Sequence, residues 1–136
     1  MITALNVTTI YVLDKEEALD FYVNKLGLEK SNDVQQGDYR WLTVRVPGGT
    51  ATEISLEQPG PPLHDENTAD QIRELMVKGA LGGGLVFIAD DVRATYDTLR
   101  QRGVTDFTQE PRDHFYGTDM GVRDPFGNAI RFLQQG

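Results

Sequence analysis

Two segments of this chain repeat one pattern, and that repeat limits the fold more than any other feature of the sequence. Each copy is a short strand of alternating apolar residues, an acidic residue at the end of the strand, and an amphipathic helix that stops at a glycine. At an offset of 77 residues, Asp14 falls on Asp91, and the two helices stop at Gly27 and Gly103. A repeat of this length in 136 residues predicts one fold made of two similar halves. Two facing halves leave a cleft, the usual place for a small ligand.

The hydrophobic pattern predicts the same βαβββ order in both halves. The expected strands are 5–13, 28–31, 39–46 and 51–57 in the first half and 85–89, 104–109, 116–123 and 129–134 in the second. Helices are expected at 14–26 and 92–102, with a short linker helix at 68–78 and polar loops elsewhere, including 32–37. The predicted fold class is α+β, with two tandem modules forming a cup-shaped, mostly antiparallel curved sheet and the helices outside it. We expect a single domain, 1–136, with module one at 1–57, a linker at 58–82 and module two at 83–136.

Composition narrows the function classes. A net charge of −8 without a basic stripe argues against nucleic acid as a partner. The absence of cysteine excludes disulfides, thiolate metal sites and cysteine nucleophiles. No apolar run approaches the length of a membrane span and no basic leader opens the sequence, so we expect a cytoplasmic protein without a membrane partner.

Three motifs carry a resemblance to a known family. These are the first repeat with Phe21 and Tyr22, the second with Asp90 and Asp91, and the closing Asp-Pro-Phe-Gly-Asn segment at 124–128. In this order and spacing they resemble the vicinal oxygen chelate superfamily, which contains glyoxalase I, fosfomycin resistance proteins, extradiol dioxygenases and bleomycin-binding proteins. The resemblance covers essentially the whole chain and implies the fold. It implies no single activity, because this fold supports several chemistries.

The resemblance also indicates where a metal ion would be held. In metal-dependent members, four positions on the first and last strands of each half carry histidine, glutamine or glutamate. The motifs map them to Val7, Glu53, Gly84 and Arg131. Only Glu53 has a metal-binding side chain, and Arg131 places a permanent positive charge where a cation would sit. We therefore expect no metal and no cofactor.

Glu53 and Arg131 are the candidate catalytic residues, and two interpretations of them stay open. As an ion pair they would satisfy each other's charge in the cup. As functional groups, Arg131 would anchor a substrate anion and Glu53 would act as a general base.

The candidate ligand-binding residues share the presumed cup face or its mouth. Trp41 would give an aromatic floor for a flat or apolar ligand, or would pack at a subunit contact. His114 and Tyr116 precede or begin a strand and would line the mouth, although His114, like His64, also has the sequence context of a surface residue. The full set is Val7, Tyr11, Trp41, Ser55, His114 and Tyr116.

Three function classes follow. The first is a binding protein that takes a small molecule in a metal-free cup, as in the bleomycin-binding branch. The second is a superfamily enzyme, of lyase, isomerase or dioxygenase type, acting without the usual metal or with a relocated site. The third is a fold kept for interactions without a ligand. The sequence leaves open whether any reaction is catalysed. The resemblance implies a homodimer, the commonest symmetric assembly.

Overall fold

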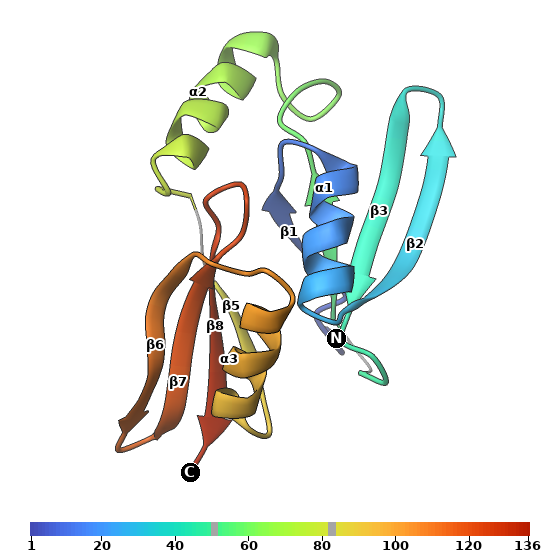
Figure 1. The fold of residues 1–136 in the computed structure, drawn as a ribbon. Helices are drawn as coiled ribbons and strands as arrows, with labels where there is room; N and C mark the ends of the chain where they lie inside the picture. Colours follow the sequence, from blue (N-terminus) through green and yellow to red (C-terminus); the bar gives the residue numbers. More distant parts are fainter. Residues whose placement is uncertain (50–51, 82–83) are drawn as a thin grey trace. The chain divides into compact units, whose positions relative to one another are not determined.

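The computed structural model describes residues 1–49, 52–81 and 84–136 and contains two four-stranded sheets built on the same plan (Figure 1). The first sheet has the order β1-β4-β3-β2 and the second β5-β8-β7-β6. In each, the first two strands of that order are parallel and the remaining pairs antiparallel. The α+β class and the βαβββ repeat predicted from the sequence are confirmed.

The first half begins with β1 (Val7–Tyr11), α1 (Lys15–Leu19) and a wider π-helical continuation, η1 (Asp20–Lys25). It ends with β2 (Glu29–Gln36), β3 (Tyr39–Arg45) and β4 (Glu53–Glu57). The connecting helix α2 (Glu66–Val77) follows. The second half contains β5 (Leu85–Ile88), α3 (Val92–Gln101), β6 (Phe107–His114), β7 (Gly117–Arg123) and β8 (Ala129–Gln135).

The repeated acidic residues are helix caps. The Asp14 side chain accepts a hydrogen bond from the Glu17 backbone N–H, and Asp91 accepts one from that of Ala94. Both caps have extended backbone, so each stops its strand and satisfies a free N–H of the helix that follows. The repeat seen in the sequence is therefore a repeated strand-to-helix junction.

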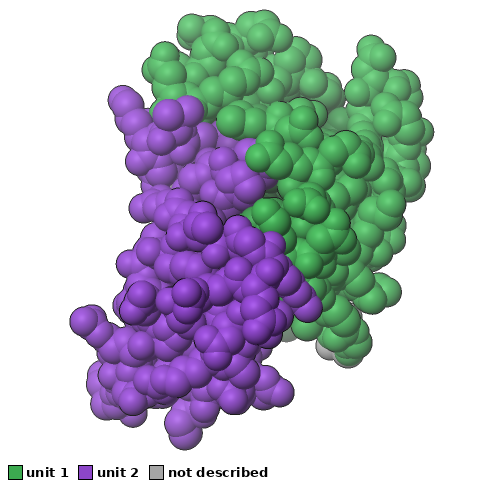
Figure 2. All heavy atoms as spheres, in the orientation of Figure 1, with its two compact units in different colours: residues 1–74 green, residues 75–136 purple. Residues whose placement is uncertain are grey.

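The chain forms two compact units, residues 1–74 and 75–136 (Figure 2). The division falls within α2, whereas the expected boundary at 82/83 lies on residues outside the described ones. The module and linker limits inferred from the sequence stay a prediction.

Each unit buries one face of its sheet beneath a helix. In the first, α1 contacts β4 and η1 contacts β2; in the second, α3 contacts β6, β7 and β8. The strand residues expected in the first core are buried: Leu42, Val44, Ile54 and Leu56. In the second, Ile130 and Phe132 are buried, while Leu85 and Phe87 are half-buried. The opposite face of each sheet carries the candidate site residues.

The expected loop at 32–37 is wrong. These residues belong mostly to β2, which pairs with β3 from Glu29 to Gln36 through one irregularity near Lys30. The sequence hides this strand because most of its side chains are exposed and polar, so no apolar alternation marks it. Backbone hydrogen bonds to β3 form it instead.

Candidate functional site

The register of the first sheet gathers five of the predicted residues on one face. Val7 pairs with Glu53, and Thr9 pairs with Ser55. Because paired residues point to the same side, the face opposite the core carries Val7, Tyr11, Trp41, Glu53 and Ser55. The sequence-based assignment of this face is consistent with Leu42 and Val44 being buried on the other side.

Glu53 is held by a polar network within this unit. Its Oε1 accepts hydrogen bonds from Thr43 Oγ1 at 2.6 Å and Asn32 Nδ2 at 2.9 Å. The bond from Thr43 is the main cause of a lowered Glu53 pKa. A carboxylate with a lowered pKa binds protons weakly, so this environment favours a fixed anion over a general base.

Two further contacts shape the same face. Thr9 Oγ1 and Ser55 Oγ lie 2.7 Å apart, and Tyr11 OH lies 3.2 Å from His64 Nε2. His64, expected at the surface, is half-buried against the Tyr11 ring.

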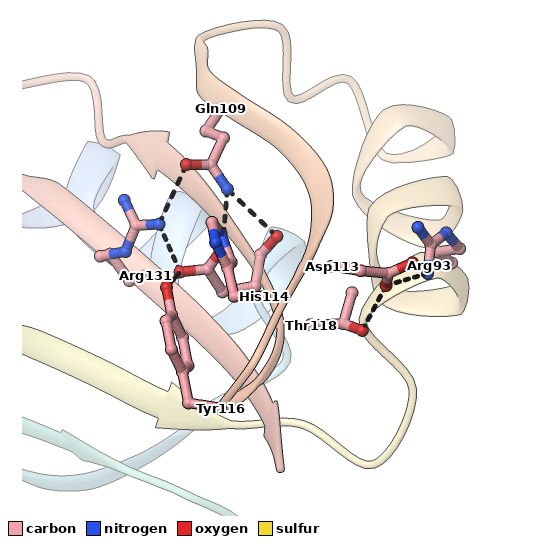
Figure 3. Close-up of polar contacts among 8 residues, drawn as sticks. Arg93, Gln109, Asp113, His114, Tyr116, Thr118 and Arg131 are labelled. Carbon is pink, nitrogen blue, oxygen red and sulfur yellow. Dashed lines mark hydrogen bonds and ion pairs between the residues drawn. The ribbon is translucent and has the colours of Figure 1, made fainter. Parts of the chain in front are cut away.

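In the second sheet, the predicted residues meet around a carboxylate that sequence reasoning missed. Asp119, on β7, is only 4% exposed and accepts four side-chain hydrogen bonds (Figure 3). Its Oδ2 accepts from Arg131 Nη2 at 2.6 Å and Tyr116 OH at 3.0 Å. Its Oδ1 accepts from Gln109 Nε2 at 2.7 Å and lies 2.8 Å from His114 Nε2. Arg131, His114 and Tyr116 are thus brought together by a residue absent from the predicted set.

The hydrogen bonds of this group, which we call the Asp119 cluster (Gln109, His114, Tyr116, Asp119 and Arg131), favour an ionised Asp119. Burial alone would raise the Asp119 pKa, but the hydrogen bonds from Arg131, Gln109 and Tyr116 outweigh it and lower the pKa to about 2. Asp119 is therefore ionised at neutral pH, and because a carboxylate only accepts, His114 Nε2 carries the proton. Burial and the bond to Asp119 raise the pKa of Tyr116. Asp119 has both oxygens engaged twice, so it positions its neighbours.

The cluster leaves binding groups facing outward. The Arg131 side chain is 42% exposed, so part of its guanidinium remains accessible. His114 and Tyr116 stack with their planes 6° apart. Next to Arg131 on the sheet, β5 exposes Val86 and Ile88, at 57% and 62%. A cation, two stacked rings and an apolar strip suit a flat molecule that carries an oxygen acceptor.

The structure corrects two sequence-based statements, one about Arg131 and one about His114. One interpretation of the sequence pairs Arg131 with Glu53, whereas the structure pairs Arg131 with Asp119 in its own unit. His114 is half-buried at the end of β6 rather than outside a strand. The sequence contained a signal for Asp119. Met120 and Val122 are apolar and share one face of β7, so residue 119 lies on the opposite face, which is the face of the sheet that carries Arg131.

The strand register also tests the residues at the family's metal positions. The two halves can be aligned through equivalent strand pairs: Thr8 pairs with Ile54 in the first half, and Leu85 pairs with Ile130 in the second. By this alignment, Ala129 is the counterpart of Glu53, and Arg131 is the counterpart of Ser55. Whether Ala129 or Arg131 occupies the fourth position, Glu53 is the only one of the four residues with a side chain that can bind a metal ion. The other two positions hold Val7 and Gly84. These residues do not fit a divalent cation, which needs several oxygen or nitrogen ligands. Among the described residues, no group of three or more His, Asp or Glu side chains has the arrangement of a metal site.

Three comparisons with known proteins bear on this site. A family model described as the Glyoxalase/Bleomycin resistance protein/Dioxygenase superfamily matches residues 4–132. YurT of Bacillus subtilis strain 168, an uncharacterized protein, is 34% identical over 130 residues, which cover 95% of this chain and 97% of YurT.

None of the helices in the described ranges is long and apolar enough to cross a membrane.

Two solved structures are similar over nearly their whole length. The crystal structure of UcmS2 is 41% identical with a TM-score of 0.92, covering 99% of this chain and 100% of UcmS2. TnmS3, an antibiotic binding protein from Streptomyces sp. CB03234, is 29% identical with a TM-score of 0.77, covering 99% and 98%.

Proposed function

Because this chain belongs to the glyoxalase/bleomycin resistance protein/dioxygenase superfamily, we propose that it binds a small organic molecule and sequesters it unchanged. The observation that carries this proposal is the full-length similarity to TnmS3, an antibiotic binding protein. An antibiotic or a molecule of similar size is accordingly the class of ligand that we assign.

The exposed chemistry of the second sheet supports a flat, largely apolar ligand with at least one oxygen acceptor. In this proposal Arg131 donates hydrogen bonds to that oxygen, and the His114–Tyr116 stack offers an aromatic surface. Val86 and Ile88 would lose water on binding, which contributes a hydrophobic gain. For the first unit, taken by itself, Trp41, Tyr11, Ser55 and Val7 remain the proposed ligand contacts.

We propose that binding needs no metal ion and no cofactor. One carboxylate among the family's metal positions supplies too few ligands, and the guanidinium of Arg131 would repel a cation. The alternative, a metal-free enzyme with Glu53 as general base, is weaker because the lowered pKa of Glu53 opposes proton uptake. We further propose a homodimer, the assembly that the family resemblance favours.

Fluorescence of Trp41, the single tryptophan, gives a direct binding assay. The chelator-treated chain is titrated with bleomycin and with a panel of flat aromatic antibiotics. We expect saturable quenching by at least one compound and binding about tenfold weaker for Arg131→Ala, the loss expected for one charged hydrogen bond. Arg93→Ala is the matched control, because Arg93 pairs with Asp113 at the surface and should leave affinity unchanged. The absence of binding across the panel would contradict the proposal.

A further inference from the structure

A polar cavity lies within the first unit. It has a volume of about 300 Å³ and lies where β1 and β4 end, beside the β2–β3 hairpin. Its charged and hydrogen-bonding lining includes Lys15, Tyr39, Arg40 and Glu57. Nothing in the proposed function uses this cavity.

Lys15 is the unusual member of that lining. Lys15 is only 9% exposed, whereas Lys25 is half-buried and Lys30 and Lys78 are exposed. Its Nζ donates one hydrogen bond, at 2.5 Å, to the Arg40 carbonyl oxygen and lies 5.2 Å from the centre of the Tyr39 ring. Among the described residues, no carboxylate lies within ion-pair distance of Lys15. The Lys15 side chain is thus buried beside the cavity, and its Nζ donates one hydrogen bond among the described residues.

The internal repeat shows that the fold does not require a lysine here. Lys15 and Val92 both follow the capping aspartate of their helix, and Val92 is fully buried. Glu57 pairs with Tyr11 in the first half, and Leu133 pairs with Ile88 at the equivalent place in the second. The second-half counterpart of Glu57 is therefore a leucine. The first half therefore places a lysine and a glutamate where the second half keeps apolar residues.

The surroundings of Lys15 lower its pKa. Burial lowers the Lys15 pKa, Glu57 and Asp33 oppose this, and the positive charge of Arg40 lowers it further; the net shift is downward. Tyr39 OH donates to Glu57 Oε1 at 2.5 Å, and burial together with this bond raises the Tyr39 pKa to about 12. A lowered pKa increases the fraction of lysine present as the neutral amine, which is the form that attacks carbonyl compounds.

We propose that Lys15 is a carbonyl-capture site that forms an imine with small aldehydes entering this cavity. The amine nitrogen bonds to the carbonyl carbon, the π-electron pair moves to the oxygen, and one proton passes from the nitrogen to that oxygen through solvent to give a carbinolamine. The oxygen then leaves as water with the second proton of the amine, so amine and aldehyde become imine and water without an oxidant or a reductant.

The four lysines of one chain provide the test. The full-length protein is incubated with propanal and sodium cyanoborohydride at neutral pH, which reduces any imine to a stable propylamine, and each lysine is followed by peptide mass spectrometry. We expect Lys15 to be labelled first, with most of Lys25, Lys30 and Lys78 still unmodified when half of Lys15 has reacted. Labelling that follows exposure, with Lys15 slowest, would overturn the proposal without any variant being made.

Two variants separate reactivity from accessibility. Glu57→Gln keeps an acceptor for Tyr39 but removes the charge that raises the Lys15 pKa, so labelling of Lys15 should become faster. Lys25→Arg, a change at a lysine outside the cavity, should leave the Lys15 rate unchanged. Slower or unchanged labelling in a folded Glu57→Gln protein would count against the proposed chemistry. Ligand binding by the sheet faces is measured separately, so either proposal can fail alone.

Discussion

Asp119 shows how one buried side chain organises a site at the residue scale. Asp119 is almost fully buried and pairs with Arg131. Asp113, on β6, is exposed and pairs with the exposed Arg93 (Figure 3). A buried carboxylate that has lost water depends on its partners, while an exposed one retains solvent. The two aspartates therefore form a matched pair for mutation.

We expect Asp119→Asn to lower the free energy of unfolding by about 2 kcal/mol, less than for a fully buried pair because Arg131 remains partly hydrated. Asp113→Asn should change it far less, because exposed ion pairs contribute little to stability. Urea denaturation of the three proteins provides the comparison. Equal effects from both substitutions would show that the Asp119 cluster adds no stability.

The lowered Asp119 pKa also predicts a pH dependence. The ordinary value is 3.8 and the folded value is about 2, so the unfolded chain takes up a proton at a higher pH than the folded chain does. The resulting stability is fully present above pH 3.8 and is lost as the pH falls towards 2. Subtracting the acid unfolding curve of Asp119→Asn from that of the wild type should isolate this loss; identical pH slopes would contradict it.

At the scale of elements, the closing turn between β7 and β8 is fixed by local chemistry. Asp124 Oδ1 accepts hydrogen bonds from the backbone N–H groups of Phe126 and Asn128. Gly127 has φ +88°, and a Cβ there would lie 2.3 Å from the Met76 carbonyl oxygen. The Asp-Pro-Phe-Gly-Asn segment is thus explained by the turn that it forms.

Gly127→Ala should lower the free energy of unfolding by more than Gly37→Ala. Both glycines have positive φ, a conformation that costs alanine about 1–2 kcal/mol. Gly37 has open space around its missing side chain, whereas Gly127 adds the clash with Met76. Thermal unfolding of the two variants is the measurement, and equal losses would mean that the α2 end adjusts without cost.

The sequence predicts elements well where local chemistry decides them and poorly where partners decide them. The two aspartate caps and the glycine stops are local, and both were recognised in the repeat. The polar part of β2 depends on pairing with β3, which no pattern within β2 reveals. Arg131 and Asp119 are adjacent only through the β7–β8 register, so the sequence supplied the arginine but not its carboxylate.

At the scale of the whole molecule, the proposed homodimer has a direct test. The turn after β6 exposes Phe115 completely. Exposed apolar residues of this kind lose water in an interface. Light scattering should give twice the chain mass of 15.2 kDa at micromolar concentration. A mass of 15.2 kDa would contradict the dimer while leaving the binding proposal intact.

The central claim is that this chain binds a small molecule unchanged and without a metal ion. The most direct measurement is calorimetric titration of the best antibiotic from the fluorescence panel into the chelator-treated protein, repeated after addition of Zn²⁺, Ni²⁺, Mn²⁺ or Fe²⁺. The ligand is then recovered and its mass determined. We predict the same stoichiometric binding in every titration and recovery of unmodified ligand. Binding that appears only with a divalent ion, or a ligand recovered as a different compound, would contradict the account.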